Sequence, residues 1–351
     1  MERKEKLIIS LCGLAAVVSG VLHFSGANAV LSFSVSAIAL ALTAIVVGDA
    51  TEQLGSRLGP GATGVLQAAF GNLPELFIAI FALRAGLAHV VQAALVGSIL
   101  GNSLLVFGLA LFLGGLKNGT QRFNSEPPRM IATLMLLAVA ALIIPTLSTS
   151  LHTPAEPHIN NLDIFVAVVL LVLFAASIYF SVKGDPALAT QVAEMGHPEW
   201  SMGLTIGVLA GAATAAAVVS DWFIEALQPA MGKLGVSEGF AGLVIVAIAG
   251  NSIENLIGIQ LAWRNQIDYA VSVILNGSLQ IALGLFPILL ILSFFLGGSI
   301  LTFVLSPILV VSLALAAVLA AFIVFDGESI WLEGLALIGL YCIIAAAFWW
   351  G

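Results

Sequence analysis

The sequence predicts an all-α polytopic membrane protein with eleven transmembrane helices, arranged as one N-terminal helix plus two inverted five-helix repeats. Three observations lead to this prediction: a very apolar composition, long uninterrupted apolar runs, and one polar motif that occurs twice. Of the 351 residues, 60% are hydrophobic and only 9% are charged, whereas soluble domains carry about 25% charged residues. This composition excludes an ordinary soluble enzyme, and no basic cluster indicates nucleic-acid binding.

The apolar runs are long enough to cross a bilayer as helices, which takes about 20 residues. Irregular backbone exposed to lipid would leave its polar groups unsatisfied, so each run is interpreted as a helix. Eleven runs are present, at residues 7–25, 29–53, 62–84, 88–115, 128–149, 160–182, 201–228, 237–262, 266–297, 301–325 and 328–350.

The first run lies within residues 1–28 and has the charged start, apolar middle and small-residue end of a signal peptide. We expect it to be retained as an N-terminal transmembrane helix. Lysine and arginine in the loops predict the orientation. With the N-terminus in the cytoplasm, nine of the eleven basic residues fall inside and only Arg84 and Lys233 fall outside. The short N-terminus favours a prokaryotic plasma membrane, with a vacuolar membrane as the alternative.

A polar stretch at residues 183–200 divides the chain in the middle. We interpret it as a cytoplasmic linker between a first repeat at 29–182 and a second repeat at 201–351, each with five runs. Because five is odd, the two repeats must enter the membrane from opposite sides. Transporters built from inverted repeats bind their substrate near the midplane, where the repeats meet.

The motif that occurs twice is Gly-Asn-x-x-Glu, at residues 71–75 and 250–254. In both copies the glutamate follows the asparagine by three residues, which places the two side chains on one helical face. A charge inside a membrane is costly and usually functional. Glu75 and Glu254 are therefore predicted to be the two central carboxylates of one site built from both repeats.

The two copies differ at one position that matters for the helix. Pro74 lacks an N–H and clashes with the carbonyl one turn back, so the first copy should interrupt its helix. The second copy has Ile253 in that place. We expect it to be less broken, or to be broken by Gly250 alone.

Further polar residues recur in the runs beside each motif. They are Asp49, Glu52, Asp221 and Glu225 in the runs before it, and Ser98, Asn102, Ser278 and Gln280 in the runs after it. The two cysteines, Cys12 and Cys342, have no metal-ligand spacing. An all-oxygen set suits a hard cation such as Ca²⁺. Two carboxylates can neutralise one divalent ion or hold two protons, and protons compete because burial favours the neutral acid.

At these residues the chain resembles the calcium/proton (cation/proton) exchanger family of the calcium/cation antiporter superfamily. The resemblance rests on the first motif, on Gly-Ser-Leu-Gln-Ile-Ala at 277–282, and on Ala-Thr-Glu at 50–52. It implies eleven spans in two inverted repeats and export of Ca²⁺ in exchange for H⁺. Asn255, where the family usually has histidine, and Pro74, which is more typical of the sodium/calcium branch, depart from its pattern.

The resemblance also implies roles for single residues. Glu75 and Glu254 would bind both calcium and protons. Asn72, Asn251 and Gln280 would complete the polar shell of the ion, with Ser98, Asn102 and Ser278 as further candidates. Glu52 and Asp221 would belong to the proton pathway.

Simpler interpretations remain for several of these residues. Asn72 and Asn251 could cap half-helices, and Glu52 and Asp221 could be solvated at the membrane interface. The serines, Asn102 and Gln280 could serve helix packing.

Other functions also stay open at this point. A Na⁺/Ca²⁺ or other cation exchanger and a passive cation channel would use similar carboxylates, whereas an intramembrane aspartyl protease would need two aspartates. We therefore expect no enzyme and no cofactor. The expected partners are Ca²⁺, H⁺ and the lipid bilayer, and a homo-oligomer is compatible with the sequence.

Overall fold

The computed structural model describes residues 3–58, 66–67, 69–183 and 200–349; at residues 252–255 and a few helix ends it describes the backbone only. The predicted linker at 183–200 thus lies almost wholly outside the described residues. Within them the chain is helical apart from two short strands. The elements before the linker are α1 (Arg3–Phe24), α2 (Ala29–Leu58), α4 (Leu73–Arg84), α5 (Ala88–Leu100), η1 (Gly101–Val106), α6 (Phe107–Asn118), β1 (Gln121–Arg122), α7 (Glu126–Ser150), η2 (Glu156–His158) and α8 (Ile159–Lys183). The elements after it are α10 (Met202–Leu234), α11 (Glu238–Phe240), η3 (Ala241–Val246), α12 (Ala247–Gly250), α13 (Ser252–Trp263), α14 (Ile267–Gln280), η4 (Ile281–Leu285), α15 (Phe286–Ser293), α16 (Pro307–Ile323), β2 (Glu328–Ser329) and α17 (Trp331–Trp349).

The described helices have the lengths of membrane spans. Eight of them are long and apolar enough to cross a bilayer, and two shorter apolar stretches occupy Glu238–Gly250 and Pro307–Ile323. The chain is therefore an all-helical, multi-pass membrane protein. The count of eleven spans stays a prediction, because part of the run at 62–84 lies outside the described residues.

Two predicted spans differ from a single continuous helix. The run at 237–262 is interrupted at Asn251, between α12 and α13. The run at 301–325 becomes helical only at Pro307, whose ring suits the first position of a helix. Before it the chain is extended and buried, which a membrane protein tolerates only where other protein groups satisfy the backbone.

Three buried side chains satisfy the backbone of this extended segment. Gln92 donates from Nε2 to the carbonyl oxygens of Thr302 (2.9 Å) and Val304 (3.1 Å). Thr146 donates to the carbonyl of Phe303 at 2.9 Å, and Asp163 accepts from the Phe303 N–H at 3.3 Å. The segment is thus tied to α5, α7 and α8.

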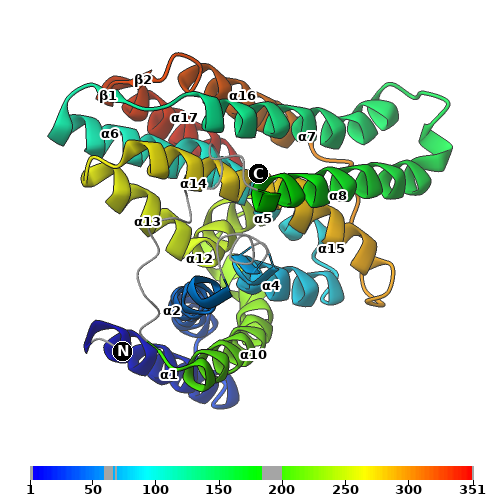
Figure 1. Cartoon of the computed structure of the whole chain (residues 1–351). Coiled ribbons are helices and arrows are strands. Elements are labelled where there is room, and N and C mark those ends of the chain that lie inside the picture. The colour runs from blue at the N-terminus through cyan, green and yellow to red at the C-terminus, as the bar shows by residue number, and fades with distance from the viewer. Residues whose placement is uncertain (1–2, 59–65, 68, 184–199, 350–351) are drawn as a thin grey trace.

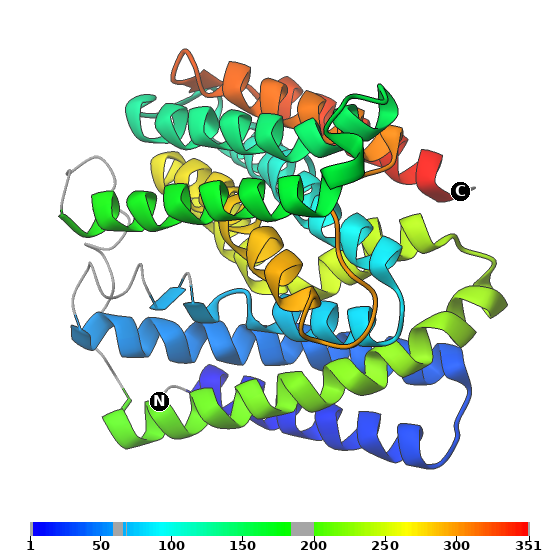
Figure 2. The same cartoon turned by 90° about the vertical axis from the view of Figure 1, so that its right-hand side faces the viewer.

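The helices form two groups. α1, α2 and α10 lie together on one side of the molecule, with α2 and α10 packed along each other (Figures 1 and 2). A small core of their own includes Cys12, Val47, Trp200 and Leu209. The remaining helices share one large hydrophobic core, to which parts of α2 and α10 also contribute. α4 bridges the groups, because it packs against both α10 and α5.

α5 and η3 cross each other at very short distance near the centre of the molecule. A Cβ added at Gly97 of α5 would collide with the backbone of Leu243 in η3, and one added at Gly242 would collide with Val90. Only glycine lets the two backbones approach this closely. This crossing places the residues after Gly97 beside the second motif.

Candidate ion-binding site

Both motifs interrupt a helix in the same way. Asn72 has φ −98° and ψ 22°, and Asn251 has φ −89° and ψ 19°, so each leaves the helical path for one residue. The next helix begins at once, at Leu73 in α4 and at Ser252 in α13. The second copy is therefore interrupted without a proline, as the second of the two expectations had it. The proline is not needed for the interruption.

Glu75 is the third residue of α4 and only 8% exposed. The first turn of a helix stabilises a negative charge, because its N–H groups point outward and its dipole is positive there. The carboxylate of Glu75 lies against the second interruption. A Cβ at Gly250 would stand 2.7 Å from Cγ and 2.9 Å from Cδ of Glu75. Gly250 thus leaves the room that the side chain of Glu75 occupies.

The two motif asparagines face the opposite half of the chain. Asn251 donates from Nδ2 to the hydroxyl of Ser98 at 2.7 Å and to the carbonyl of Ala247 at 3.0 Å. Asn72 donates from Nδ2 to Oε1 of Gln280 at 3.4 Å. Neither side chain makes an N-capping bond to the helix that follows it, but the bond from Asn251 to Ala247 satisfies a carbonyl of α12, the half-helix before it. Both Oδ1 atoms are buried without a hydrogen-bond partner among the described residues.

Ser278 also joins the two halves, but through helix packing. Its hydroxyl pairs with that of Ser103 at 2.9 Å and reaches the carbonyl of Ile99 at 3.4 Å. Sequence reasoning did not select Ser103 as a site residue, although it lies in the same polar stretch as Ser98 and Asn102. Asn102 is buried in η1, where its Nδ2 has no partner within the described part of the chain.

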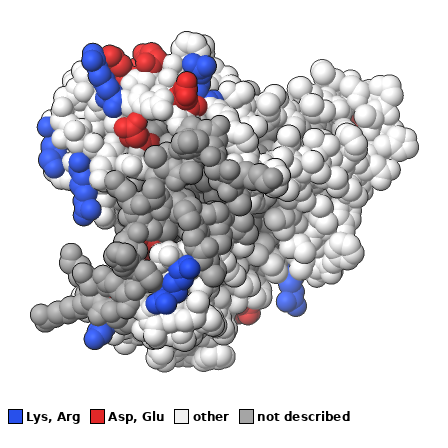
Figure 3. Space-filling model, in the orientation of Figure 1, with Lys and Arg blue, Asp and Glu red and all other residues white. Residues whose placement is uncertain are grey.

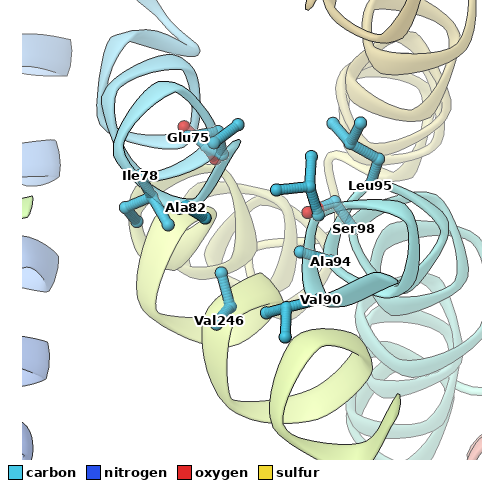
Figure 4. A pocket seen from close by; sticks show the side chains of 10 residues that line it. Glu75, Ile78, Ala82, Val90, Ala94, Leu95, Ser98 and Val246 are labelled. Carbon is cyan, nitrogen blue, oxygen red and sulfur yellow. The ribbon is translucent and has the colours of Figure 1, made fainter. Parts of the chain in front are cut away.

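A small pocket lies beside Glu75, between α4, α5 and η3 (Figure 4). Glu75 and Ser98 are its polar lining residues, and the others are apolar side chains such as Ile78, Val90 and Val246. A single carboxylate in such surroundings is a strong attractor for a cation, because the low dielectric strengthens the charge interaction. Ser98 links this pocket to Asn251 through the hydrogen bond of 2.7 Å.

The structure does not bring all predicted residues to this place. Glu254 is the third residue of α13, as Glu75 is of α4, but its side chain lies outside the described residues. Glu52 is exposed on α2, and Asp221 is half-buried on α10. Neither is among the described residues that line the pocket at Glu75.

Three of the described spans around the site contain a widened, π-helical turn: η3, which precedes α12, and the pair η1 and η4. η1 follows α5, which carries Ser98, and η4 follows α14, which carries Ser278 and Gln280. The two turns begin 180 residues apart, at Gly101 and Ile281. π-Helical turns are rare and often lie at functional sites, and no feature of the sequence analysis indicated them.

The donor set is made of oxygen. It contains one described carboxylate, that of Glu75, together with amide and hydroxyl oxygens from both halves of the chain. No group of three or more histidine, cysteine, aspartate or glutamate residues occurs in the part of the chain that the structure describes. This chemistry suits a hard cation and not a transition metal.

Known proteins share both the sequence and the fold. The family model described as sodium/calcium exchanger protein matches residues 28–183 and 204–350. The Ca(2+)/H(+) antiporter of Synechocystis is 34% identical over 99% of this chain and 98% of that protein. The Ca(2+)/H(+) antiporter ChaA of Bacillus subtilis is 36% identical over 95% of each chain. The solved structure of YfkE superposes with a TM-score of 0.83 at 32% identity, covering 98% of this chain and 99% of that one. The chain therefore belongs to the sodium/calcium exchanger protein family and, within it, is similar to the calcium/proton antiporters.

Proposed function

We propose that this protein is a secondary-active antiporter that exports Ca²⁺ in exchange for H⁺ by alternating access. The observation that carries the proposal is the buried carboxylate of Glu75, which lies against the second helix interruption. Full-length relatives that are named Ca²⁺/H⁺ antiporters support the choice of ions. We assign no enzymatic activity, since the family consists of transporters.

The ion would be bound by groups from both motifs. Glu75 and Glu254 supply two negative charges, which neutralise one Ca²⁺ or hold two protons. The Oδ1 atoms of Asn72 and Asn251 and the amide of Gln280 add neutral oxygens, towards the six to eight that calcium takes. Ion and protons thus compete for the same carboxylates, which couples their movements.

Alternating access requires that one group of helices moves against another. We assign the movement to α2 and α10, the first helix of each proposed repeat, because they pack along each other and share a separate small core with α1. The site residues on α4, α5, α12, α13 and α14 form the fixed part. Glu52 and Asp221, which lie on the moving helices, would serve the outer steps of proton transfer.

The proposed architecture is eleven spans in two inverted repeats, at 29–182 and 201–351, after the N-terminal helix. Its support is the matching interruption at Asn72 and Asn251 and the pair of π-helical turns. The N-terminus is assigned to the cytoplasm of a prokaryotic cell. In agreement, charged side chains gather toward one end of the molecule, where α6, β1, β2 and α13 lie (Figures 1 and 3). Lys117, Arg122, Arg129 and Arg264 are exposed in this region.

Flux measurements in proteoliposomes test the proposal. A pH gradient without sodium should drive Ca²⁺ uptake in the wild type, and the neutral variants Glu75→Gln and Glu254→Gln should each abolish it. Asp268→Asn, which removes an exposed carboxylate from the first turn of α14, is the matched control.

Two other results would replace the proposal. Pro74 and the family's description point to sodium as the alternative coupling ion. Uptake that follows a sodium gradient and ignores pH would make the protein a Na⁺/Ca²⁺ exchanger. Flux that ignores both gradients would make it a passive channel.

A further inference from the structure

A second pocket lies next to the first, beside the part of the α5–η1 span that follows Ser98 in the sequence. The pocket at Glu75 uses the α5 residues from Val90 to Ser98, whereas this one uses those from Gly97 to Val106, with α12 and α17 as its other walls. Ser98 lines both pockets. Its hydroxyl therefore lies between a pocket that contains a carboxylate and a pocket whose described lining contains no charge.

Three polar atoms in the second pocket have no hydrogen-bond partner among the described residues. They are Nδ2 of Asn102, Oδ1 of Asn251 and the hydroxyl oxygen of Tyr341. The three side chains are 2%, 3% and 4% exposed, and all of them line the pocket. Buried polar groups are almost always paired with protein or with water, so three unpaired groups on residues that line one pocket point to a bound polar molecule.

The three atoms match the bonding capacity of one water molecule. The two bonds that Nδ2 of Asn251 donates orient this amide, so its Oδ1 accepts a hydrogen bond. Nδ2 of Asn102 donates one, and the Tyr341 hydroxyl can do either. A water that accepts from Asn102 and Tyr341 and donates to Asn251 satisfies all three, and its second O–H remains for Ser98. A cation would meet the N–H of Asn102 and no countercharge, so the pocket itself does not suit Ca²⁺. The Oδ1 atom of Asn251 has two lone pairs, so it can accept from this water and still offer one lone pair to the ion.

We propose that this pocket is a water site that carries protons to the ion-binding site, on a route separate from the pocket that receives Ca²⁺. The water passes a proton to the Ser98 oxygen while Ser98 gives its own proton to the Glu75 carboxylate. The water regains a proton from the Tyr341 hydroxyl, whose oxygen in turn takes one proton from the aqueous side of the membrane, so no charge is left on the route. This inference rests on the proposed Ca²⁺/H⁺ antiport, and it assigns Tyr341 a role in proton transfer.

Two transport assays distinguish a defect in proton transfer from a defect in calcium movement. Uptake driven by a pH gradient requires both, whereas exchange of labelled Ca²⁺ for Ca²⁺ at equal pH needs no net proton transfer. Tyr341→Phe removes one hydroxyl and keeps the ring. We expect it to slow pH-driven uptake by about 10-fold or more, since a positioned proton-transfer group contributes about 10²–10⁴-fold. Ca²⁺/Ca²⁺ exchange should stay within about twofold of the wild type, because no proton is transferred in that mode.

A second variant tests the pocket without touching its polar groups. Gly101 lines it, and a Cβ added there meets no atom within 4 Å. Gly101→Ala should therefore fit and take up part of the space of the water, with the same selective loss. Tyr179→Phe, which changes an exposed tyrosine on α8, is the matched control and should alter neither mode.

The outcomes are distinct. An equal loss of both modes in both variants would assign the pocket to packing and overturn the inference, as would wild-type rates in both modes. A wild type that exchanges Ca²⁺ but ignores the pH gradient would instead overturn the proposed function, and the inference with it.

Discussion

The two helix interruptions have the same backbone geometry, yet different interactions hold them. At the first, Pro74 restricts the backbone of α4, and the bond from Asn72 to Gln280 is long, at 3.4 Å. At the second there is no proline, and Asn251 is bound to Ser98 at 2.7 Å. The comparison teaches that the interruption follows from what both copies share, the Gly-Asn pair and the glutamate in the next helical turn. Proline stiffens the copy whose hydrogen bond is weaker.

Of the changes that compare the two interruptions, the largest loss of Ca²⁺ uptake is expected at the contact between Gly250 of the second motif and Glu75 of the first. Gly250→Ala would place a methyl group 2.7 Å from Cγ of Glu75 and displace its carboxylate. A shift of about 1 Å at a reacting group can cost about 100-fold, so we expect pH-driven Ca²⁺ uptake to fall by that order. Gly13→Ala on α1 is the control, because its Cβ meets no atom within 4 Å. Normal uptake by Gly250→Ala would disprove the contact.

The next largest effect is a difference in Ca²⁺ affinity between variants of the two motif asparagines, Asn72 and Asn251. Both variants to alanine lose a proposed ligand oxygen, but Asn251→Ala also removes the short bond to Ser98. Losing a buried hydrogen bond costs about 1–3 kcal/mol, and the middle of this range corresponds to about 30-fold in affinity. The KM for Ca²⁺ should therefore rise more in Asn251→Ala than in Asn72→Ala. The opposite order would show that the first interruption holds the ion more tightly.

Proline should matter less than its position suggests. Pro74 is the second residue of α4, where a helix has no N–H bond to lose, and Ile253 holds the same position in α13. We expect Pro74→Ala, and the reciprocal Ile253→Pro, to keep Ca²⁺ uptake within about threefold of the wild type, since proline is tolerated in a first turn. Abolished uptake in Pro74→Ala would mean that the proline creates the first interruption after all.

The smallest effect on transport is expected at the packing serine. Ser278→Ala loses the bond to Ser103 and should lower the stability in thermal unfolding by about 1 kcal/mol. Its uptake should stay within about twofold, since a packing bond is not made to the ion. Ser98→Ala, the corresponding change in the first half of the chain, should impair uptake much more, because it removes the partner of Asn251. Equal effects on uptake would remove the distinction between packing and site serines.

Much of the fold could be predicted because apolar length alone identifies a membrane span. The places where the prediction differs are those where protein groups, and not lipid, surround the backbone. The extended segment before Pro307 is apolar in sequence, and its irregular backbone depends on Gln92, Thr146 and Asp163 from distant helices. Single-sequence patterns contain no trace of such partners.

The candidate site was predictable as far as its residues repeat. Glu75, Asn72 and Asn251 were found through the twofold motif, and the structure brings the three into one region. Tyr341 was missed because it is a single tyrosine in an apolar run, with no counterpart in the first half. The proposed role of Tyr341 depends on the residues that line the pocket with it, and these are known only from the packing of α17 against η1.

The π-helical turn has a consequence for the whole α5–η1–α6 span. A wider turn rotates the side chains that follow it around the helix axis, by about 100° for each added residue. Ser98, before the turn, must point at Asn251, while Gly108, after it, must lie against the backbone of Gly334 in α17. Deleting one residue at the turn would keep the span long and apolar but rotate Gly108 away from α17. The fit of this span therefore depends on the rotation of its second half relative to its first half, as well as on its length and hydropathy.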